Sequence, residues 1–126
     1  MGRTIKLGEP TVITSVLEPH ELVFEDDGET GYLYVLDLDR AAHEEQPILD
    51  ALMIYTVGEE RGDEHDIEIL WSESRHTAIL FVDDIAQALV DFAEPRFMCR
   101  TGYPAPAPNA PVHTHAWDET VWQSHV

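Results

Sequence analysis

The sequence predicts a single antiparallel β-rich domain of the α+β class, mostly β, with one or two short helices and a Pro-rich C-terminal extension. Runs of strand length that are rich in β-branched and aromatic residues recur along residues 1–103. Turn sequences that contain Gly and Asp separate these runs. In Asp66–Ser72, every second residue is Ile67, Ile69 or Trp71, which is the period of a half-buried strand.

The N-terminal half contains four strand-length runs. Between the second and third runs, Asp26–Gly31 includes an Asp-Gly pair, which predicts a hairpin because both residue types tolerate positive φ. Positive φ at Gly28 and Gly31 would explain both glycines. Pro47 suits the first turn of a helix, so we expect a short helical turn at Pro47–Leu52. The four runs are Thr11–Leu17, Leu22–Glu25, Tyr32–Leu38 and Ala51–Val57.

The second half continues the β pattern. After the strand at Asp66–Ser72, a turn leads to a returning strand at Thr77–Val82. Ile85–Ala93 has apolar residues at both helical and strand spacing; we favour a strand that follows a hairpin turn at Asp83-Asp84, with a helix as the alternative. Phe97–Tyr103 adds a short strand. Typical strand lengths then give about six to eight strands.

The composition changes at Pro104. Residues 1–103 form the predicted β-rich globular domain, and residues 104–126 form a Pro-rich connector followed by a segment with aromatic and histidine side chains. The final stretch carries Trp117 and Trp122 and is too apolar for a solvated tail. We therefore expect it to pack onto a folded surface, either of its own chain (in cis) or of another chain (in trans).

The chain is strongly acidic, with 25 Asp and Glu against 7 Lys and Arg and a formal net charge of −18. Such a surface repels nucleic acids and anionic membranes, and it attracts basic protein surfaces. We therefore expect no nucleic acid or membrane as a partner. The expected partner is a protein with a basic surface, or a second copy of this chain.

The chain has the features of a cytoplasmic protein. Cys99 is the only cysteine, so the chain cannot form an internal disulfide. The segment Met1–Thr11 lacks the apolar stretch of a signal peptide, and no apolar run has the length of a membrane span. We expect a cytoplasmic location.

Four carboxylates cluster at the predicted hairpin: Glu25, Asp26, Asp27 and Glu29. Such a cluster is a solvated turn, a site for a hard cation, or a contact surface for a basic partner. The spacing lacks the alternating acidic positions and the distal Glu of a calcium-binding helix-loop-helix. We take these four residues, with Tyr32, Trp117 and Trp122, as the candidate partner-binding residues.

His113 and His115 form a His-x-His pair. On a strand, both imidazoles would lie on one face, with the carboxylate of Asp118 near enough to serve as a third ligand. These three residues are the candidate site for a divalent transition metal. The alternative is that the histidines are structural, and no other cofactor is expected.

No complete catalytic signature is present. The chain has neither a nucleophile elbow nor a Gly-rich phosphate loop, and the Cys99 thiol has no accompanying motif. We assign no catalytic residue and favour a non-enzymatic protein. Asp50 lies among apolar residues, so we expect its carboxylate to be hydrogen-bonded or paired.

Several phrases of the sequence resemble a bacterial domain family of unknown function. They are Phe24–Tyr32 (FEDDGETGY), Pro47–Leu52 (PILDAL), Ile69–Ser72 (ILWS) and Cys99–Pro104 (CRTGYP). The resemblance implies a small, compact bacterial protein without an assigned activity, and so it supplies no catalytic residues. The stretch after Pro104, with His113 and His115, lies outside the resemblance.

Three functional hypotheses follow. The first is a non-enzymatic acidic protein-binding module, one version of which is an immunity-type inhibitor of a basic partner. The second is a metal-binding protein that uses the C-terminal His-x-His segment. The third is a structural homodimer subunit, held together through the segment that carries Trp117 and Trp122.

Overall fold

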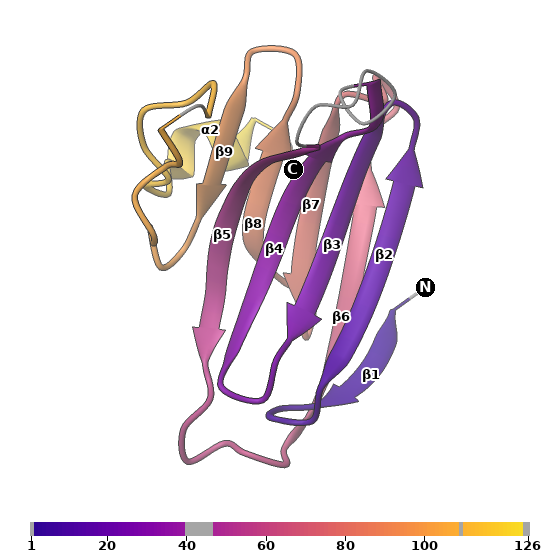
Figure 1. Ribbon diagram of the computed structural model, residues 1–126, viewed down its shortest axis with the longest axis vertical. Coiled ribbons are helices and arrows are strands. Elements are labelled where there is room, and N and C mark those ends of the chain that lie inside the picture. The colour runs from indigo at the N-terminus through magenta and orange to yellow at the C-terminus, as the bar shows by residue number, and fades with distance from the viewer. Residues whose placement is uncertain (1, 40–46, 109, 125–126) are drawn as a thin grey trace.

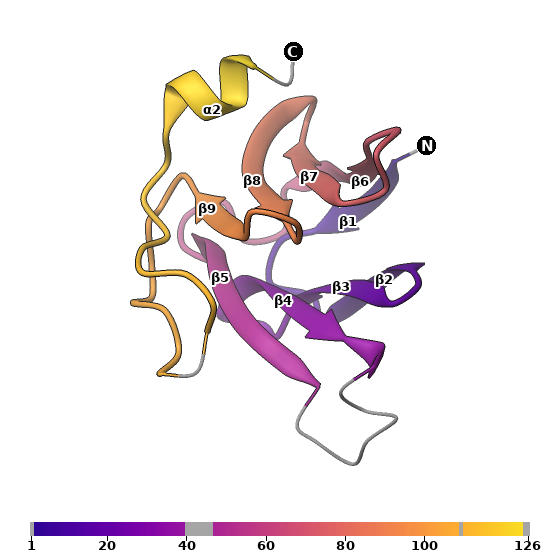
Figure 2. The same cartoon turned by 90° about the horizontal axis from the view of Figure 1, so that it is seen from above.

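Two antiparallel sheets face each other in the computed structural model, which describes residues 2–39, 47–108 and 110–124 (Figures 1 and 2). The described strands are β1 (Arg3–Lys6), β2 (Thr11–Leu17), β3 (His20–Asp26), β4 (Thr30–Asp37), β5 (Ile48–Thr56), β6 (Glu64–Trp71), β7 (Thr77–Val82), β8 (Ile85–Asp91) and β9 (Arg96–Cys99). One sheet has the order β1-β6-β7-β8-β9, and the other has the order β2-β3-β4-β5.

The predicted mostly β, antiparallel architecture is confirmed, since the described strand pairs are all antiparallel. The described part of the chain has nine strands rather than six to eight. The sequence did not indicate β1, because Ile5 is the only buried residue among its four and leaves no periodic signal. The favoured strand at Ile85–Ala93 is confirmed as β8, and Asp83 and Asp84 turn the chain before it with φ of 51° and 66°.

The helical turn expected at Pro47–Leu52 is wrong. Strand β5 begins at Ile48 and pairs with β4. Its side chains alternate between the two faces of the sheet, so that Asp50, Leu52 and Ile54 are buried. The burial of this inward-facing row, together with the ladder hydrogen bonds, outweighs the local preference of Pro47 for a helix start.

The β3–β4 hairpin forms where the Asp-Gly pair predicts it, but its two glycines have different roles. Gly28 has φ of +104°, as expected. Gly31 does not have positive φ; it lies in β4, where an added Cβ would come within 2.5 Å of the Tyr55 ring. The space that the tyrosine ring occupies, and not the backbone conformation, therefore requires glycine at position 31.

The core lies between the sheets and consists of the inward-facing residues of each strand. Full burial of a large apolar side chain stabilises the folded state by about 1.5–3 kcal/mol. The fully buried members of this core include Leu22, Phe24, Leu33 and Leu52 from the four-stranded sheet, and Ile67, Leu80, Val90 and Phe97 from the five-stranded sheet.

The C-terminal segment packs in cis along the side of the sandwich where β5 and β9 are the edge strands, and its last part lies over the outer side of the five-stranded sheet (Figure 2). The N–H of Cys99 donates to the carbonyl of His115, and Cys99 forms a parallel bridge with Ala116. Helix α2 (Glu119–Gln123) follows, and Trp122 packs edge-to-face against Phe81 at 6.1 Å between ring centroids. The segment therefore lines the edges of β5 and β9, and α2 covers part of the outer face of the five-stranded sheet.

A buried ion pair holds this segment to the four-stranded sheet. Nε2 of His115 lies 2.5 Å from Oδ2 of Asp50 in β5, and the side chains are 0% and 2% exposed. Nδ1 of His115 lies 2.6 Å from the carbonyl oxygen of Pro104. Both ring nitrogens of His115 thus face oxygen atoms, one of the Asp50 carboxylate and one of the Pro104 carbonyl. The expectation that Asp50 is paired is correct.

Replacement of His115 by Ala tests the contribution of this pair. His115→Ala leaves the Asp50 carboxylate buried without its partner, and breaking a buried pair in this way costs about 3–5 kcal/mol. We expect a loss of that size in the free energy of unfolding, measured by urea denaturation.

The matched control is His113→Ala, which removes the exposed histidine of the same His-x-His pair. This variant should change the free energy of unfolding by no more than about 0.5 kcal/mol. Equal losses in the two variants would contradict a specific role for the buried pair.

Candidate functional site

The outer face of the four-stranded sheet presents apolar and aromatic side chains to solvent. They alternate along each strand with the buried core residues, so their outward direction follows from the pleat. No other described element crosses this face, which is the one toward the viewer in Figure 1. We call it the tyrosine face; its residues are Val12, Val16, Glu21, Val23, Glu25, Tyr32, Tyr34 and Met53.

Two stacked tyrosines occupy the middle of the tyrosine face. The Tyr32 and Tyr34 rings lie 6.0 Å apart with an interplanar angle of 20°. Partial burial raises the pKa of Tyr34, and the nearby carboxylates of Glu25 and Asp27 raise it further because they disfavour a phenolate. The face is therefore aromatic in shape and negative in potential.

The tyrosine face runs out to an open strand edge at β2. Val12 and Val16 are 52% and 47% exposed, and strand Thr11–Leu17 contains no charged residue. Nη1 of Arg3 donates to the carbonyl of Val12 at 3.4 Å, which shows that this carbonyl points away from β3. Uncharged edge strands are sites where another chain can add a strand.

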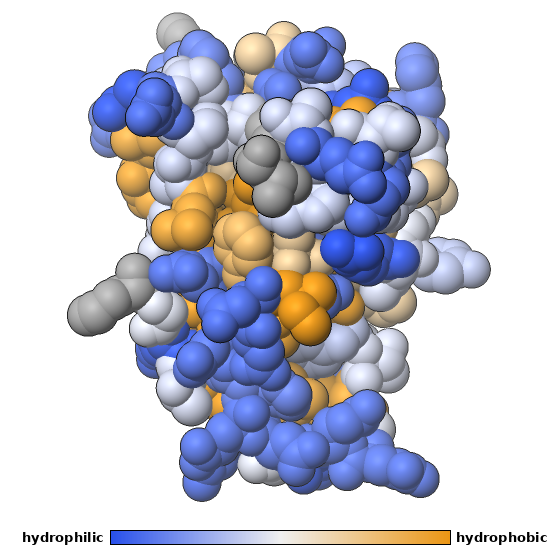
Figure 3. Space-filling model, turned by 180° about the vertical axis from the view of Figure 1, so that it is seen from behind, coloured by the Kyte–Doolittle hydropathy of each residue, from blue (hydrophilic) through white to orange (hydrophobic). Residues whose placement is uncertain are grey.

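The opposite side of the molecule has a different surface. Figure 3 views it from behind and shows hydrophobic patches interrupted by hydrophilic side chains. Its exposed apolar residues include Leu70 and Ile85, which are 45% and 57% exposed. The C-terminal segment also covers part of this side (Figure 2).

The carboxylates of the acidic hairpin have different environments, since some are buried and others lie at the surface. Asp26 is fully buried, and its carboxylate accepts hydrogen bonds from the N–H of Gly8, the N–H of Gly28 and the hydroxyl of Tyr55. It stabilises the turn instead of facing a partner. The Asp27 carboxylate accepts the N–H groups of Glu29 and Thr30, which lowers its pKa.

The other predicted partner-binding residues lie in two separate places. Glu25 and Tyr32 are directly opposite each other on the tyrosine face. Trp117 and Trp122 lie on the far sheet, where they serve the docking of the C-terminal segment. The guanidinium of Arg100 sits 4.2 Å from the centre of the Trp117 ring. The structure therefore does not bring the two tryptophans together with the hairpin.

The predicted metal ligands do not converge. His113 is exposed, and His115 is buried with both ring nitrogens beside protein oxygens. Asp118 is the N-cap of α2, where its carboxylate accepts the N–H groups of Thr120 and Val121. Within residues 2–39, 47–108 and 110–124, no group of three or more His, Cys, Asp or Glu side chains is placed to hold a metal ion. The metal site stays a prediction without structural support.

One end of the sandwich carries an aromatic cluster that the sequence did not indicate. His20 of β3 stacks on Phe92 at 3.9 Å between ring centroids, with Trp71 and His76 close by. Burial, followed by the neighbouring His76, lowers the pKa of His20, while Asp37 and Asp39 act in the opposite direction. The cluster joins strands from both sheets, which no local pattern in the sequence encodes.

Comparison with known families gives a match over residues 5–126, to a family described as an uncharacterized protein conserved in bacteria (DUF2251). The chain belongs to the DUF2251 family. The predicted resemblance to a bacterial family of unknown function is thus confirmed. The match is wider than expected, because it includes the segment after Pro104 that carries His113 and His115.

A relative of this DUF2251 protein occurs in Haemophilus influenzae and is described as an uncharacterized protein. The two are 38% identical over an alignment of 106 positions, and the match covers 79% of this chain. The same match covers 63% of the relative, so the chain spans less than two thirds of that protein's length. No solved structure matches the chain, and no helix in the described ranges is long and apolar enough to cross a membrane.

The lowered pKa of His20 predicts a pH dependence for this DUF2251 protein. Below the ordinary value of 6.5, the unfolded chain takes up a proton at this position before the folded chain does. The free energy of unfolding should therefore fall as the pH drops from that value toward the pKa of folded His20. NMR titration of the imidazole should place its midpoint below 6.5.

Variants of His76 and Asp37 test the direction in which each of these neighbours shifts the pKa of His20. His76→Ala should raise the His20 midpoint, because it removes a positive neighbour, and Asp37→Asn should lower it, because it removes a negative one. A titration midpoint of His20 at or above that of a histidine in the unfolded chain would contradict the lowered pKa in the folded protein.

Proposed function

We propose that this DUF2251 protein is an acidic protein-binding module that holds a basic partner on the tyrosine face. The observation that carries the proposal is a set of Tyr, Val and Met side chains, exposed at Val12 and Val16 and half-buried at the others, interleaved with Glu21 and Glu25 on one outward sheet face. Aromatic residues are frequent anchors of protein interfaces, because a tyrosine ring combines a large contact area with a polar tip.

The arrangement of charges on this face suits a basic partner. Glu25 lies between Val12 of β2 and Tyr32 of β4, and Glu21 lies between Val16 and Leu36. An arginine or lysine of the partner can reach either carboxylate while its carbon chain contacts the neighbouring valine or tyrosine. An acidic partner would meet two carboxylates without compensation, so the face discriminates by charge.

The net charge of −18 supports the same proposal at longer range. Opposite charge steers association and raises its rate above that of neutral surfaces. One version of the function is an immunity-type inhibitor that neutralises a basic protein. The homodimer predicted through Trp117 and Trp122 is a separate hypothesis, in which the two rings would contact a second copy in addition to Arg100 and Phe81 of their own chain.

The test uses the partner that the wild-type protein captures from its host. Tyr34→Ala removes one of the two central rings and should weaken binding of that partner about 30-fold, the usual effect at an interface anchor. Tyr103→Ala is the matched control, because Tyr103 is 64% exposed but lies outside the tyrosine face. Surface plasmon resonance gives both affinities and both association rates.

The salt dependence of the association rate tests the electrostatic part of the proposed interaction. The association rate of the wild-type protein should fall several-fold between low salt and about 0.3 M salt, because screening removes the long-range attraction. A rate that salt does not change, or equal affinities for Tyr34→Ala and Tyr103→Ala, would overturn the proposal.

A further inference from the structure

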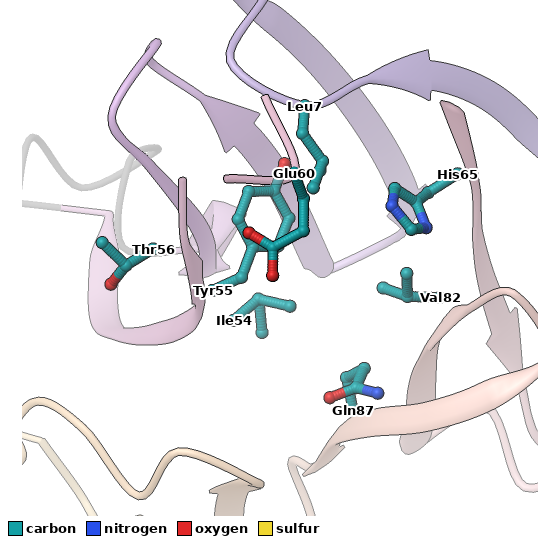
Figure 4. Close-up of a pocket in the computed structure, with 8 residues that line it drawn as sticks. All are labelled: Leu7, Ile54, Tyr55, Thr56, Glu60, His65, Val82 and Gln87. Carbon is teal, nitrogen blue, oxygen red and sulfur yellow. The ribbon is translucent and has the colours of Figure 1, made fainter. Parts of the chain in front are cut away.

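A cleft opens between the two sheets, at the end where β5 leads into β6 (Figure 4). Its volume is about 200 Å³. The apolar walls come from Leu7, Ile54 and Val82, and Glu60, His65 and Gln87 contribute polar groups. Tyr55 and Thr56 complete the lining. These residues belong to both sheets and to the β5–β6 loop, so folding is needed to bring them together.

His65 points into this cleft because it continues the inward-facing row of β6. The row runs through Trp71, Ile69 and Ile67, and the same period of two reaches His65 at the end of the sandwich. Figure 4 shows the imidazole facing the space between Leu7, Glu60 and Val82. An imidazole thus occupies a position at which the other members of the row are apolar.

A carboxylate fixes the orientation of His65. Nδ1 of His65 lies 2.5 Å from Oδ2 of Asp83, and Oδ1 of Asp83 accepts the N–H of Asp66 at 2.8 Å. These two contacts, the backbone N–H first, lower the pKa of Asp83 and keep it a carboxylate. A carboxylate at Nδ1 requires a hydrogen there, so in the neutral ring Nε2 carries the free lone pair.

Nε2 of His65 is buried and has no hydrogen-bond partner among the described residues. A buried polar atom normally finds a partner, and one without it marks a place that water, an ion or a ligand fills. Because Nε2 is the acceptor in the neutral ring, the missing group is a hydrogen-bond donor.

The chemistry of the cleft defines the ligand further. The Glu60 carboxylate is a second acceptor on the wall of the cleft, and its negative charge repels an anion. The carbon walls favour an apolar group. The volume of about 200 Å³ is somewhat larger than that of an apolar cavity of ~150 Å³ that takes benzene.

We propose that this cleft binds a small organic amine. The protonated amino group lies between Nε2 of His65 and the carboxylate of Glu60, and a single ring-sized apolar group packs against Leu7, Ile54 and Val82. This site is separate from the tyrosine face, and its function does not depend on the protein-binding proposal.

Three probes of the same shape test the proposal: benzylamine, benzyl alcohol and benzoate. In NMR titrations of the full chain, the backbone amides of Leu7, Ile54 and Val82 should shift with benzylamine, more weakly with benzyl alcohol and not with benzoate. In the wild-type protein, bound benzylamine should also shift the Nε2 resonance of His65 more than the Nδ1 resonance. This second readout requires no variant to fold.

Two pairs of variants distinguish direct contacts with benzylamine in the cleft from the effect of removing a charge or a histidine elsewhere in the protein. Glu60→Gln should reduce the benzylamine affinity at least five-fold and bring it close to that of benzyl alcohol. Glu59→Gln removes the same charge from the adjacent residue outside the cleft and should leave the affinity within two-fold. His65→Gln should weaken benzylamine binding about ten-fold, whereas His76→Gln, in the turn between β6 and β7, should not.

Specific outcomes overturn the proposal. They are the absence of shifts at the cleft with millimolar benzylamine, equal effects of Glu59→Gln and Glu60→Gln, or tighter binding of benzoate than of benzylamine. An unperturbed His65 Nε2 resonance in the presence of bound benzylamine would also overturn it, because the amino group would then lie elsewhere.

Discussion

The position of the C-terminal segment depends on the burial of Asp50 and His115 as a pair. Either side chain buried alone would lose its hydration without a partner to replace it. The pair joins an edge strand of the four-stranded sheet to a segment that also bonds to Cys99 at the edge of the other sheet. The N–H of Ala107 also approaches the Asp50 carboxylate. One polar contact therefore closes the β5 and β9 side of the sandwich, while the β1 and β2 side has no such cover among the described residues (Figure 2).

Much of the fold was predictable because its signals are local. The Asp-Gly pair predicts the β3–β4 hairpin, and the alternation in Asp66–Ser72 predicts β6. The failures have non-local causes. Pro47 is a helix signal that strand pairing overrides, and Gly31 owes its identity to a tyrosine ring twenty-four residues away. Strand β1 is held by its pairing with β6, which the sequence near Arg3 does not reveal.

The candidate sites were only partly predictable. Tyr32 and Glu25 were identified as partner-binding residues from composition, but the tyrosine face as a whole requires the register of four strands. Asp26 and His115 were grouped with surface or metal-binding residues, whereas the fold buries both side chains. Apolar neighbours in the sequence distinguish the buried carboxylate of Asp50, but no such feature separates Asp26 from the solvated carboxylates next to it in the hairpin. The His65 cleft had one usable signal, since the alternation of Ile67 and Ile69 extends to this histidine.

The uncharged β2 edge also has a consequence for solubility. Its neighbour β1 carries Arg3 and Lys6, the kind of local charges that keep exposed edges apart, but β2 carries none. The β2 edges of two copies are therefore kept apart by the repulsion between two whole molecules of charge −18. That repulsion weakens as the Debye length shrinks from about 10 Å at 0.1 M salt to about 3 Å at 1 M. We therefore expect the colloidal stability of concentrated solutions to fall as the ionic strength rises.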